Sequence, residues 1–222
     1  MLNLIFVIFL SYIVGSIPTS IIVSKLVRGI DIREHGSGNA GGTNVFRVLG
    51  WKWGVLTIIL DALKGALAVI VVARMYLDHF PFNNITPFDD FTLVQIICGV
   101  AAVIGHIWTI FAGFKGGKGI ATGLGVLIMI VTVDMAVALG VFILAVTISR
   151  YISLGSLLAA ISVPLILIIR ENIFGVNIPG YHTLLPFCIG LALLVIYTHR
   201  ANIGRILEGS ERKISFVKKN SN

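Results

Sequence analysis

Residues 119–149 read GIATGLGVLIMIVTVDMAVALGVFILAVTIS and contain one charged side chain, Asp134. A transmembrane helix needs about 20 apolar residues, and a shorter one suffices where a helix bundle shields its ends. We therefore interpret this stretch as two short spans, 119–133 and 135–149, separated around Asp134. The alternative is a single long helix, which would leave the chain with one span fewer.

The composition of the whole chain is that of a membrane protein. Of its 222 residues, 57% are hydrophobic and 12% are charged, and the mean hydropathy is +0.99. A soluble domain carries about 25% charged residues, which cover its water-facing surface. We therefore exclude a soluble protein and expect an all-α integral membrane protein with lipid as its main solvent.

Five further apolar stretches complete a prediction of seven transmembrane helices. We find no internal repeat and no second domain, so we expect a single polytopic membrane domain of residues 1–222. The predicted spans are 2–24, 53–77, 92–112, 119–133, 135–149, 154–169 and 183–199.

The placement of Lys and Arg predicts the orientation, because cytoplasmic loops carry an excess of both. With the N-terminus outside and the C-terminus cytoplasmic, 14 of the 17 basic residues fall in cytoplasmic segments. The six-span alternative would move Arg150 and the basic C-terminal tail outside, so we reject it. The same bias explains the net charge of +7 without a nucleic acid partner. The 14 basic residues are Lys25, Arg28, Arg33, Arg47, Lys52, Lys115, Lys118, Arg150, Arg200, Arg205, Arg212, Lys213, Lys218 and Lys219, and the outer loops hold mainly Asp78, Asp89, Asp90, Asp134 and Glu171.

Glycines and small polar residues are dense in the predicted cytoplasmic segment 36–47, which reads GSGNAGGTNVFR. Glycines allow the backbone to wrap around a ligand and to present N–H groups to it, and Arg47 adds a fork suited to phosphate. A flexible turn at the membrane interface would explain the glycines but not the polar side chains. The formal match to G-x-G-x-x-G lacks the strand–turn–helix context of a dinucleotide site. The candidate ligands of the segment are Ser37, Gly38, Asn39, Thr43, Asn44 and Arg47.

A second anion site is indicated by FKGGKGIAT at 114–122, where two lysines alternate with glycines before a predicted membrane helix. The N-terminus of a helix offers unpaired N–H groups and a positive dipole end. It is not a Walker A loop, because Ala112 replaces its first glycine and Gly119 its Ser or Thr. Anchoring by positive charge would explain the lysines but not the glycines. The candidate ligands are Lys115, Gly116, Gly117 and Lys118.

Polar residues also follow the last predicted span, in YTHRANIGR at 197–205. His199, Asn202 and Arg205 share one face if the helix continues, although an anchoring helix end remains the alternative. Ser156, in RYISLGS at 150–156, is a candidate hydroxyl on the same side of the membrane.

Ionisable residues also occur inside two predicted spans. Asp61 and Lys64 lie at helical spacing in the second span, where charge is costly unless it is paired. We expect an internal ion pair that braces the site. We interpret His106, a lone histidine in the third span, as a structural hydrogen bonder.

In these motifs the sequence resembles the bacterial acyl-phosphate:glycerol-3-phosphate acyltransferase family, the PlsY family. The resemblance covers nearly the whole chain. It implies seven membrane helices and transfer of a fatty acyl group from acyl-phosphate to the 1-hydroxyl of sn-glycerol 3-phosphate, giving lysophosphatidic acid and inorganic phosphate. The matching blocks are GSIP at 15–18, the segment 36–47, LDALKG at 60–65, GH at 105–106 with FKGGKGIAT, RYISLGS, and HRANIGR at 199–205.

Together, the motifs and the resemblance predict the residues of the site. The resemblance also implies no cofactor and no direct donation from coenzyme A or acyl carrier protein, and the residues provide no metal-ligand cluster. We expect Ser37, Lys118 and His199 to be catalytic. We expect substrate binding by Gly38, Asn39, Thr43, Asn44, Arg47, Lys115, Gly116, Gly117, Ser156, Asn202 and Arg205.

The pattern H-x-x-x-x-D of coenzyme A-dependent glycerolipid acyltransferases is absent. The fifth residue after His35, His79, His106, His182 and His199 is Ala40, Asn84, Phe111, Phe187 and Gly204, respectively. We therefore favour acyl-phosphate as the donor, in a monomer of the bacterial cytoplasmic (inner) membrane that contacts membrane lipids and faces the cytoplasm with its active site. The alternatives are a transporter of phosphorylated metabolites and a non-enzymatic lipid-binding scaffold.

Overall fold

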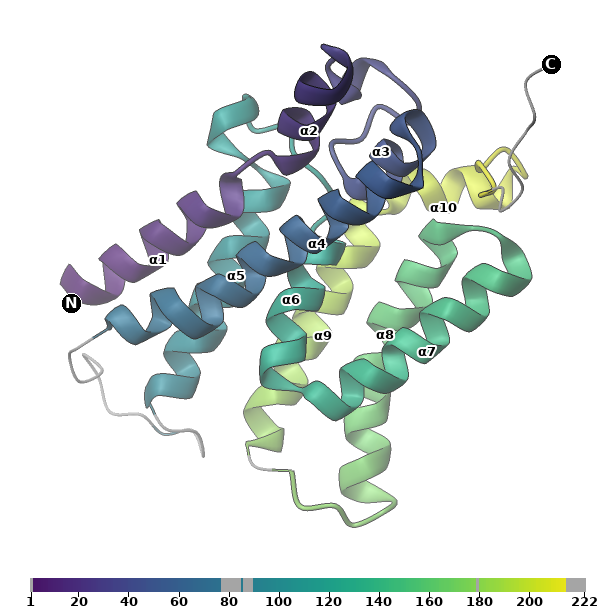
Figure 1. Cartoon of the computed structure of the whole chain (residues 1–222). Helices are drawn as coiled ribbons and strands as arrows, with labels where there is room; N and C mark the ends of the chain where they lie inside the picture. The colour runs from purple at the N-terminus through teal and green to yellow at the C-terminus, as the bar shows by residue number, and fades with distance from the viewer. Residues whose placement is uncertain (1, 77–84, 86–89, 179, 215–222) are drawn as a thin grey trace.

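A computed structural model describes residues 2–76, 85, 90–178 and 180–214, and these residues form helices joined by loops (Figure 1). Asp78, Asp89, Lys218 and Lys219, which entered the orientation argument, lie outside the described residues. The helices are α1 (Leu2–Ser16), α2 (Thr19–Arg28), η1 (Ile32–Glu34), α3 (Gly42–Leu49), α4 (Trp51–Leu67), η2 (Ala68–Val72), η3 (Ala73–Met75), α5 (Asp90–Ile107), η4 (Ile110–Ala112), α6 (Ile120–Ile130), α7 (Thr132–Ser149), α8 (Ile152–Asn172), α9 (Tyr181–Thr198) and α10 (Arg200–Leu207).

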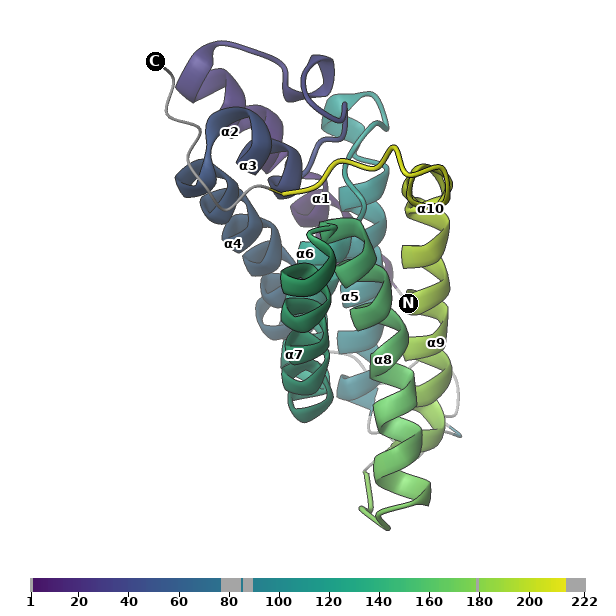
Figure 2. The same ribbon diagram turned by 90° about the vertical axis from the view of Figure 1, so that its right-hand side faces the viewer.

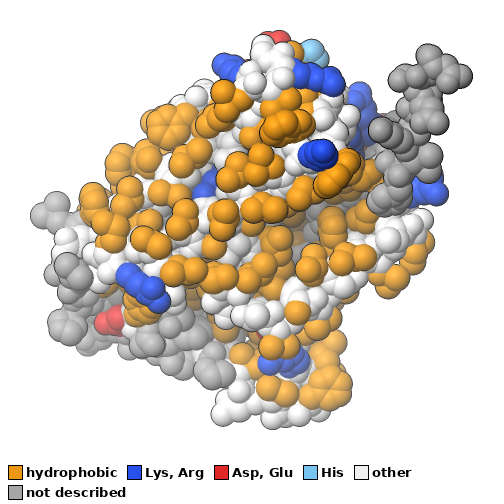
Figure 3. All heavy atoms as spheres, in the orientation of Figure 1, with side chains coloured by type: hydrophobic (Ala, Val, Ile, Leu, Met, Phe, Trp, Pro, Cys, Tyr) orange, Lys and Arg blue, Asp and Glu red, His pale blue; other side chains and the backbone are white. Residues whose placement is uncertain are grey.

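The all-helical prediction is confirmed, and the described residues provide six candidate membrane spans. By length and hydropathy these are Asn3–Arg28, Trp51–Met75, Leu93–Ala112, Thr132–Ser149, Ile152–Asn172 and Tyr181–Thr198. The apolar helix α6 lies within the predicted fourth span but is shorter, at 11 residues. Hydrophobic side chains are spread over the whole face seen in Figure 3, and many large ones are exposed, as expected for contact with lipid.

The predicted boundary at Asp134 is wrong by a few residues. The chain turns at Val131, whose backbone (φ −130°, ψ 63°) is not helical. The single long helix is therefore excluded as well, and α6 and α7 are separate (Figure 1). Asp134 does not lie in a loop, because it is buried in the first turn of α7 and accepts a hydrogen bond from Arg170 of α8 at 2.7 Å.

The predicted first span, 2–24, is also interrupted. Proline fixes its own φ and disfavours a helical conformation at the residue before it. Accordingly α1 ends at Ser16, and α2 begins at Thr19 after Pro18. In Figure 1 the short helix α2 continues away from the end of α1, near α3.

Two helix pairs approach closely through glycines. Gly15 and Gly105 lie between α1 and α5, and Gly65 and Gly125 between α4 and α6. A Cβ atom added at any of the four would lie within 2.2 Å of a backbone carbonyl oxygen of the facing helix. Small residues at such contacts let membrane helices pack through van der Waals contact where lipid provides no hydrophobic driving force.

The bundle consists of two connected parts. One part packs α1 against α5 and α4 against α6, and the other packs α8 between α7 and α9 (Figures 1 and 2). The loop that precedes α3, the start of α6 and the helix α10 gather at the same end of the molecule (Figure 1). The predicted cytoplasmic motifs lie in these segments.

Candidate active site

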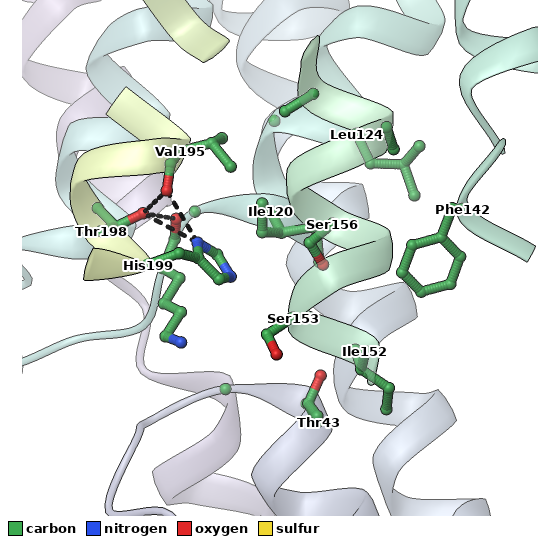
Figure 4. A pocket seen from close by; sticks show the side chains of 18 of the residues that line it. Thr43, Ile120, Leu124, Phe142, Ile152, Ser153, Ser156, Val195, Thr198 and His199 are labelled. Carbon is green, nitrogen blue, oxygen red and sulfur yellow. Dashed lines mark hydrogen bonds between the residues drawn. The ribbon is translucent and has the colours of Figure 1, made fainter. Parts of the chain in front are cut away.

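A cavity of about 770 Å³ opens among α3, α4, α6, α7, α8, α9 and α10. Its polar end is lined by the loop before α3, by Lys118, and by the α9–α10 junction. Its apolar arm lies between α6, α7, α8 and α9 (Figure 4). The volume is within the range of small-molecule sites, about 300–1,000 Å³. One cavity therefore offers both a polar and an apolar environment.

The N-termini of four helices line the polar end. α3 begins at Gly42, α6 at Ile120, α8 at Ile152 and α10 at Arg200, and all four residues line the cavity. The first N–H groups of a helix have no partner within the helix, and the dipole places positive charge at this end. The backbone alone therefore makes this end favourable for an anion.

Cationic side chains add to this positive potential. Lys118, Arg47 and Arg205 line the cavity, as does Arg200, whose guanidinium donates to the Tyr197 carbonyl and lies over the Tyr197 ring. Of these four, only Arg205 is ion-paired to a carboxylate in the part of the chain that the structure describes. The Nε atom of Arg47 is buried without a hydrogen-bond partner. Burial lowers the pKa of Lys118 to about 8, and the neighbouring charges of Arg205 and Arg47 act in the same direction. A bound anion would compensate the charges of Arg47 and Lys118.

Glu211 organises the wall of the polar end. Its carboxylate accepts hydrogen bonds from Ser153 Oγ, Asn202 Nδ2 and Arg205 Nε, each at 2.7 Å. Burial alone would raise the pKa of Glu211, but these three donors outweigh it and lower the pKa. The charged carboxylate thus ties the segment after α10 to α8. Glu211 is not among the predicted site residues, since nothing in its local sequence pattern indicates these contacts.

His199 lies at the junction of α9 and α10, with its ring in the cavity (Figure 4). Its Nδ1 is 2.9 Å from the carbonyl oxygen of Val195, which can only accept, so Nδ1 carries the proton. Burial, and then the charge of Lys118, lower the pKa of His199 to about 4. The imidazole is therefore neutral at physiological pH, and its Nε2 can accept a hydrogen bond. Lys118 donates a hydrogen bond to Asn202 beside it.

The predicted first loop reaches the cavity, but its members differ in their contacts. Ser37, Gly38, Asn39 and Thr43 line the polar end. Asn44 lines it too, yet its side chain is already engaged: it donates to the carbonyls of Ile32 and His35, both at 2.9 Å, and accepts from the Ser37 N–H at 2.8 Å. Asn44 therefore shapes the loop.

Three predicted ligands of the second loop do not line this cavity. Lys115 is exposed to solvent. Gly116 and Gly117 pack against His106, and a Cβ on either would lie within 2.2 Å of a His106 atom. Their lack of a side chain therefore serves the close approach of the loop to α5. Ser156, Asn202 and Arg205 do line the cavity, together with Lys118.

The predicted ion pair in the second span is confirmed. Lys64 Nζ lies 2.8 Å from Asp61 Oδ1, and both side chains are buried. Asp61 also accepts from Thr19 Oγ1, and His106 Nδ1 is 3.4 Å away. Lys64 donates in addition to the carbonyl of Ile17 at 2.9 Å. The network joins α2, α4 and α5 behind the polar end, where Asp61 and His106 contribute to the cavity lining.

The family model described as glycerol-3-phosphate acyltransferase matches residues 5–209. The glycerol-3-phosphate acyltransferase of Chlorobaculum tepidum is 48% identical, covering 99% of this chain and 100% of the relative. That of Chlorobium chlorochromatii is 46% identical, covering 98% and 100%. Among solved structures, the glycerol 3-phosphate form of PlsY (YgiH), an integral membrane glycerol 3-phosphate acyltransferase, aligns with a TM-score of 0.78 at 36% identity over 96% of both chains. Its lysophosphatidic acid form aligns with a TM-score of 0.76 at 35% identity, covering 96% of this chain and 95% of the other.

Proposed function

The chain belongs to the glycerol-3-phosphate acyltransferase family, and we propose that its cavity binds glycerol 3-phosphate together with an acyl-phosphate donor. The protein is a membrane acyltransferase that acylates glycerol 3-phosphate, a step of phospholipid synthesis. The proposed products are lysophosphatidic acid, acylated at the 1-hydroxyl, and inorganic phosphate. No cofactor is needed for this exchange.

The amphipathic cavity is the observation that carries this proposal. Each substrate has a phosphate, and one also has a fatty acyl chain. Four helix N-termini and the cations Arg47, Lys118 and Arg205 surround the polar end, while the apolar arm adjoins it directly. A donor can therefore place its phosphate and its chain in matching environments, with its carbonyl carbon where the two meet.

The proposed step is attack of the 1-hydroxyl oxygen on the carbonyl carbon of the acyl-phosphate. The new C–O ester bond forms as the bond between the carbonyl carbon and the phosphate oxygen breaks, and the electron pair leaves with phosphate. The hydroxyl proton ends on the phosphate. Lys118 and the loop N–H groups stabilise the phosphate charge, and Ser37 helps to hold it. His199 accepts a hydrogen bond from the hydroxyl and orients it, in keeping with its lowered pKa of about 4.

The remaining predicted ligands receive roles according to their place in the cavity. Gly38, Asn39 and Thr43 offer backbone and side-chain donors to phosphate, and Ser156 offers a hydroxyl to the reacting groups. Asn202 positions Lys118, because it accepts a hydrogen bond from Lys118 and donates one to Glu211. We do not assign substrate contacts to Lys115, Gly116 or Gly117.

We further propose a single domain of seven membrane-spanning helices, with the short α6 as the fourth. The N-terminus is outside and the C-terminus is cytoplasmic, in the bacterial inner membrane, and the cavity faces the cytoplasm. The excess of Lys and Arg in the segments around the polar end supports this orientation. We propose a monomer, since residues of one chain line both the polar end and the apolar arm.

The test is an assay of the detergent-purified protein with palmitoyl-phosphate and glycerol 3-phosphate. We expect equimolar release of inorganic phosphate and lysophosphatidic acid, and no product when palmitoyl-coenzyme A replaces the donor. Product from palmitoyl-coenzyme A but not from palmitoyl-phosphate would refute acyl-phosphate as the donor. Uptake of glycerol 3-phosphate into proteoliposomes without acylation would favour a transporter. The buried residues packed beyond the apolar arm argue against a transporter, because they leave no path through the bundle there.

A further inference from the structure

The apolar arm of the cavity has a closed deep end. Its lining stops at the same level on three helices, at Met135 of α7, Val163 of α8 and Cys188 of α9, with Leu127 of α6 beside them. All four belong to one buried cluster, and none exposes more than 8% of its surface. The arm therefore ends within the protein core.

The residues beyond this level are packed and do not line the cavity. Val131, Leu167, Tyr181 and Leu184 continue the same cluster toward the far end of the bundle. Next to Met135, the ion pair of the buried Asp134 with the partly exposed Arg170 at 2.7 Å joins α7 to α8, and Asn172 donates to the Tyr181 hydroxyl at 2.8 Å. These contacts hold the helices together and keep the deep end closed.

The arm has a definite length. Cys188 lies about 15 Å along α9 from Thr198, and Val163 lies about 15 Å along α8 from Ser153, at about 1.5 Å rise per residue. Alanines at 138, 159, 160 and 192 line the middle of the arm, where small side chains leave room for a chain. The four alanines thus leave room between larger lining residues such as Leu124, Phe142 and Leu191, and Leu127 and Met135 stand at the deep end.

We infer that Leu127, Met135, Val163 and Cys188 form an end wall that sets the acyl-chain length this enzyme prefers. The inference rests on the proposed function, since the occupant of the arm is the chain of the acyl donor. A chain that reaches the wall buries all its methylenes against apolar side chains. A longer chain must bend or leave part of itself outside the arm, and a shorter one leaves a void. Each methylene so lost costs roughly fourfold in kcat/KM, from about 0.8 kcal/mol per buried methylene.

The test measures kcat/KM of purified variants with octanoyl-, lauroyl- and palmitoyl-phosphate. Cys188→Phe fills the deep end and should lower the lauroyl to octanoyl ratio at least tenfold. Met135→Ala enlarges the deep end and should raise the palmitoyl to lauroyl ratio several-fold. Leu193→Phe is the matched control, because it adds the same kind of ring on α9 at an exposed side chain outside the cavity and should leave both ratios within about twofold.

The results distinguish failure of the end-wall inference from failure of the proposed acyl-phosphate donor. An active Cys188→Phe variant with the wild-type ratio would overturn the inference. If that variant does not fold, Met135→Ala decides in its place, and an unchanged palmitoyl to lauroyl ratio would overturn the inference. Failure of the wild-type enzyme with every acyl-phosphate refutes the donor instead. In that case kcat/KM of the same variants is measured with the acyl donor that the wild-type enzyme does use, at the same acyl-chain lengths.

Discussion

Replacement of Lys118 by methionine removes an ammonium group from the polar end and keeps most of its apolar stem. A charge-assisted hydrogen bond contributes about 1.5–3 kcal/mol, and two unit charges about 4 Å apart attract by about 4 kcal/mol at an effective dielectric constant near 20. The loss of solvation that lowers the pKa of Lys118 offsets part of this attraction. We expect a net loss of about 2–3 kcal/mol, hence a roughly 30- to 150-fold fall in kcat/KM for glycerol 3-phosphate.

The pH dependence of the wild-type enzyme adds a second measurement. Bound phosphate favours protonated Lys118, so binding is strongest below the pKa of about 8 and weakens as pH rises through it. Above about pH 7 the substrate phosphate is already doubly charged, so its own titration does not interfere. We expect KM to rise by up to about tenfold per pH unit above pH 8, and this rise to disappear in the Lys118→Met variant.

Steady-state phosphate release in detergent, at saturating acyl-phosphate, measures both effects. Lys52→Met is the matched control, because Lys52 is exposed and outside the cavity, and its kcat/KM should stay within about twofold of wild type. A Lys118→Met enzyme with near-normal KM, or with the wild-type rise of KM above pH 8, would refute the assignment of Lys118 to phosphate.

Three further predictions concern other parts of the site. Lys115→Ala should change the KM for glycerol 3-phosphate less than about twofold, because Lys115 lies outside the cavity; a rise like that of Lys118→Met would restore it as a ligand. His199→Gln should keep turnover within about tenfold of wild type and raise KM. The reason is that one neutral hydrogen-bond acceptor replaces another, since the imidazole has a pKa of about 4. Loss of turnover at unchanged KM would instead make His199 the catalytic base. Asp61→Ala should destabilise the protein by about 3–5 kcal/mol, because it leaves Lys64 buried and unpaired. The double variant Asp61→Leu with Lys64→Met should recover most of this loss, as measured in a thermal unfolding scan. Equal melting temperatures of the single and double variants would contradict this expectation.

Local sequence patterns were enough to locate most helices. An apolar run of about 20 residues must be helical in lipid, because no water satisfies its backbone groups. The breaks were harder to place. Pro18 interrupts the first predicted span and Val131 separates α6 from α7, three residues before Asp134. The interruption at Pro18 follows a general rule that the hydropathy pattern masks, whereas the turn at Val131 has no comparable local signal.

The residues of the site were likewise only partly predictable from the sequence. Ser37, Thr43, Arg47, Lys118 and His199 were selected from their motifs, and the structure gathers all five around one cavity. The motifs also selected neighbouring residues that do not line it. In the second loop a glycine beside a lysine suggests phosphate binding, but Gly116 and Gly117 lack a side chain because His106 occupies that space.

Composition and short motifs are enough to predict the membrane class, the apolar segments and the chemical types in the site. Which of those residues meet depends on the tertiary structure. Glu211 joins Ser153 and Asn202 across 58 and nine positions of the chain, and the N-termini of four helices converge on the same polar end. Packing of helices far apart in the chain creates such contacts. The closed end of the apolar arm has the same origin, because Met135, Val163 and Cys188 become one wall only when three helices pack together.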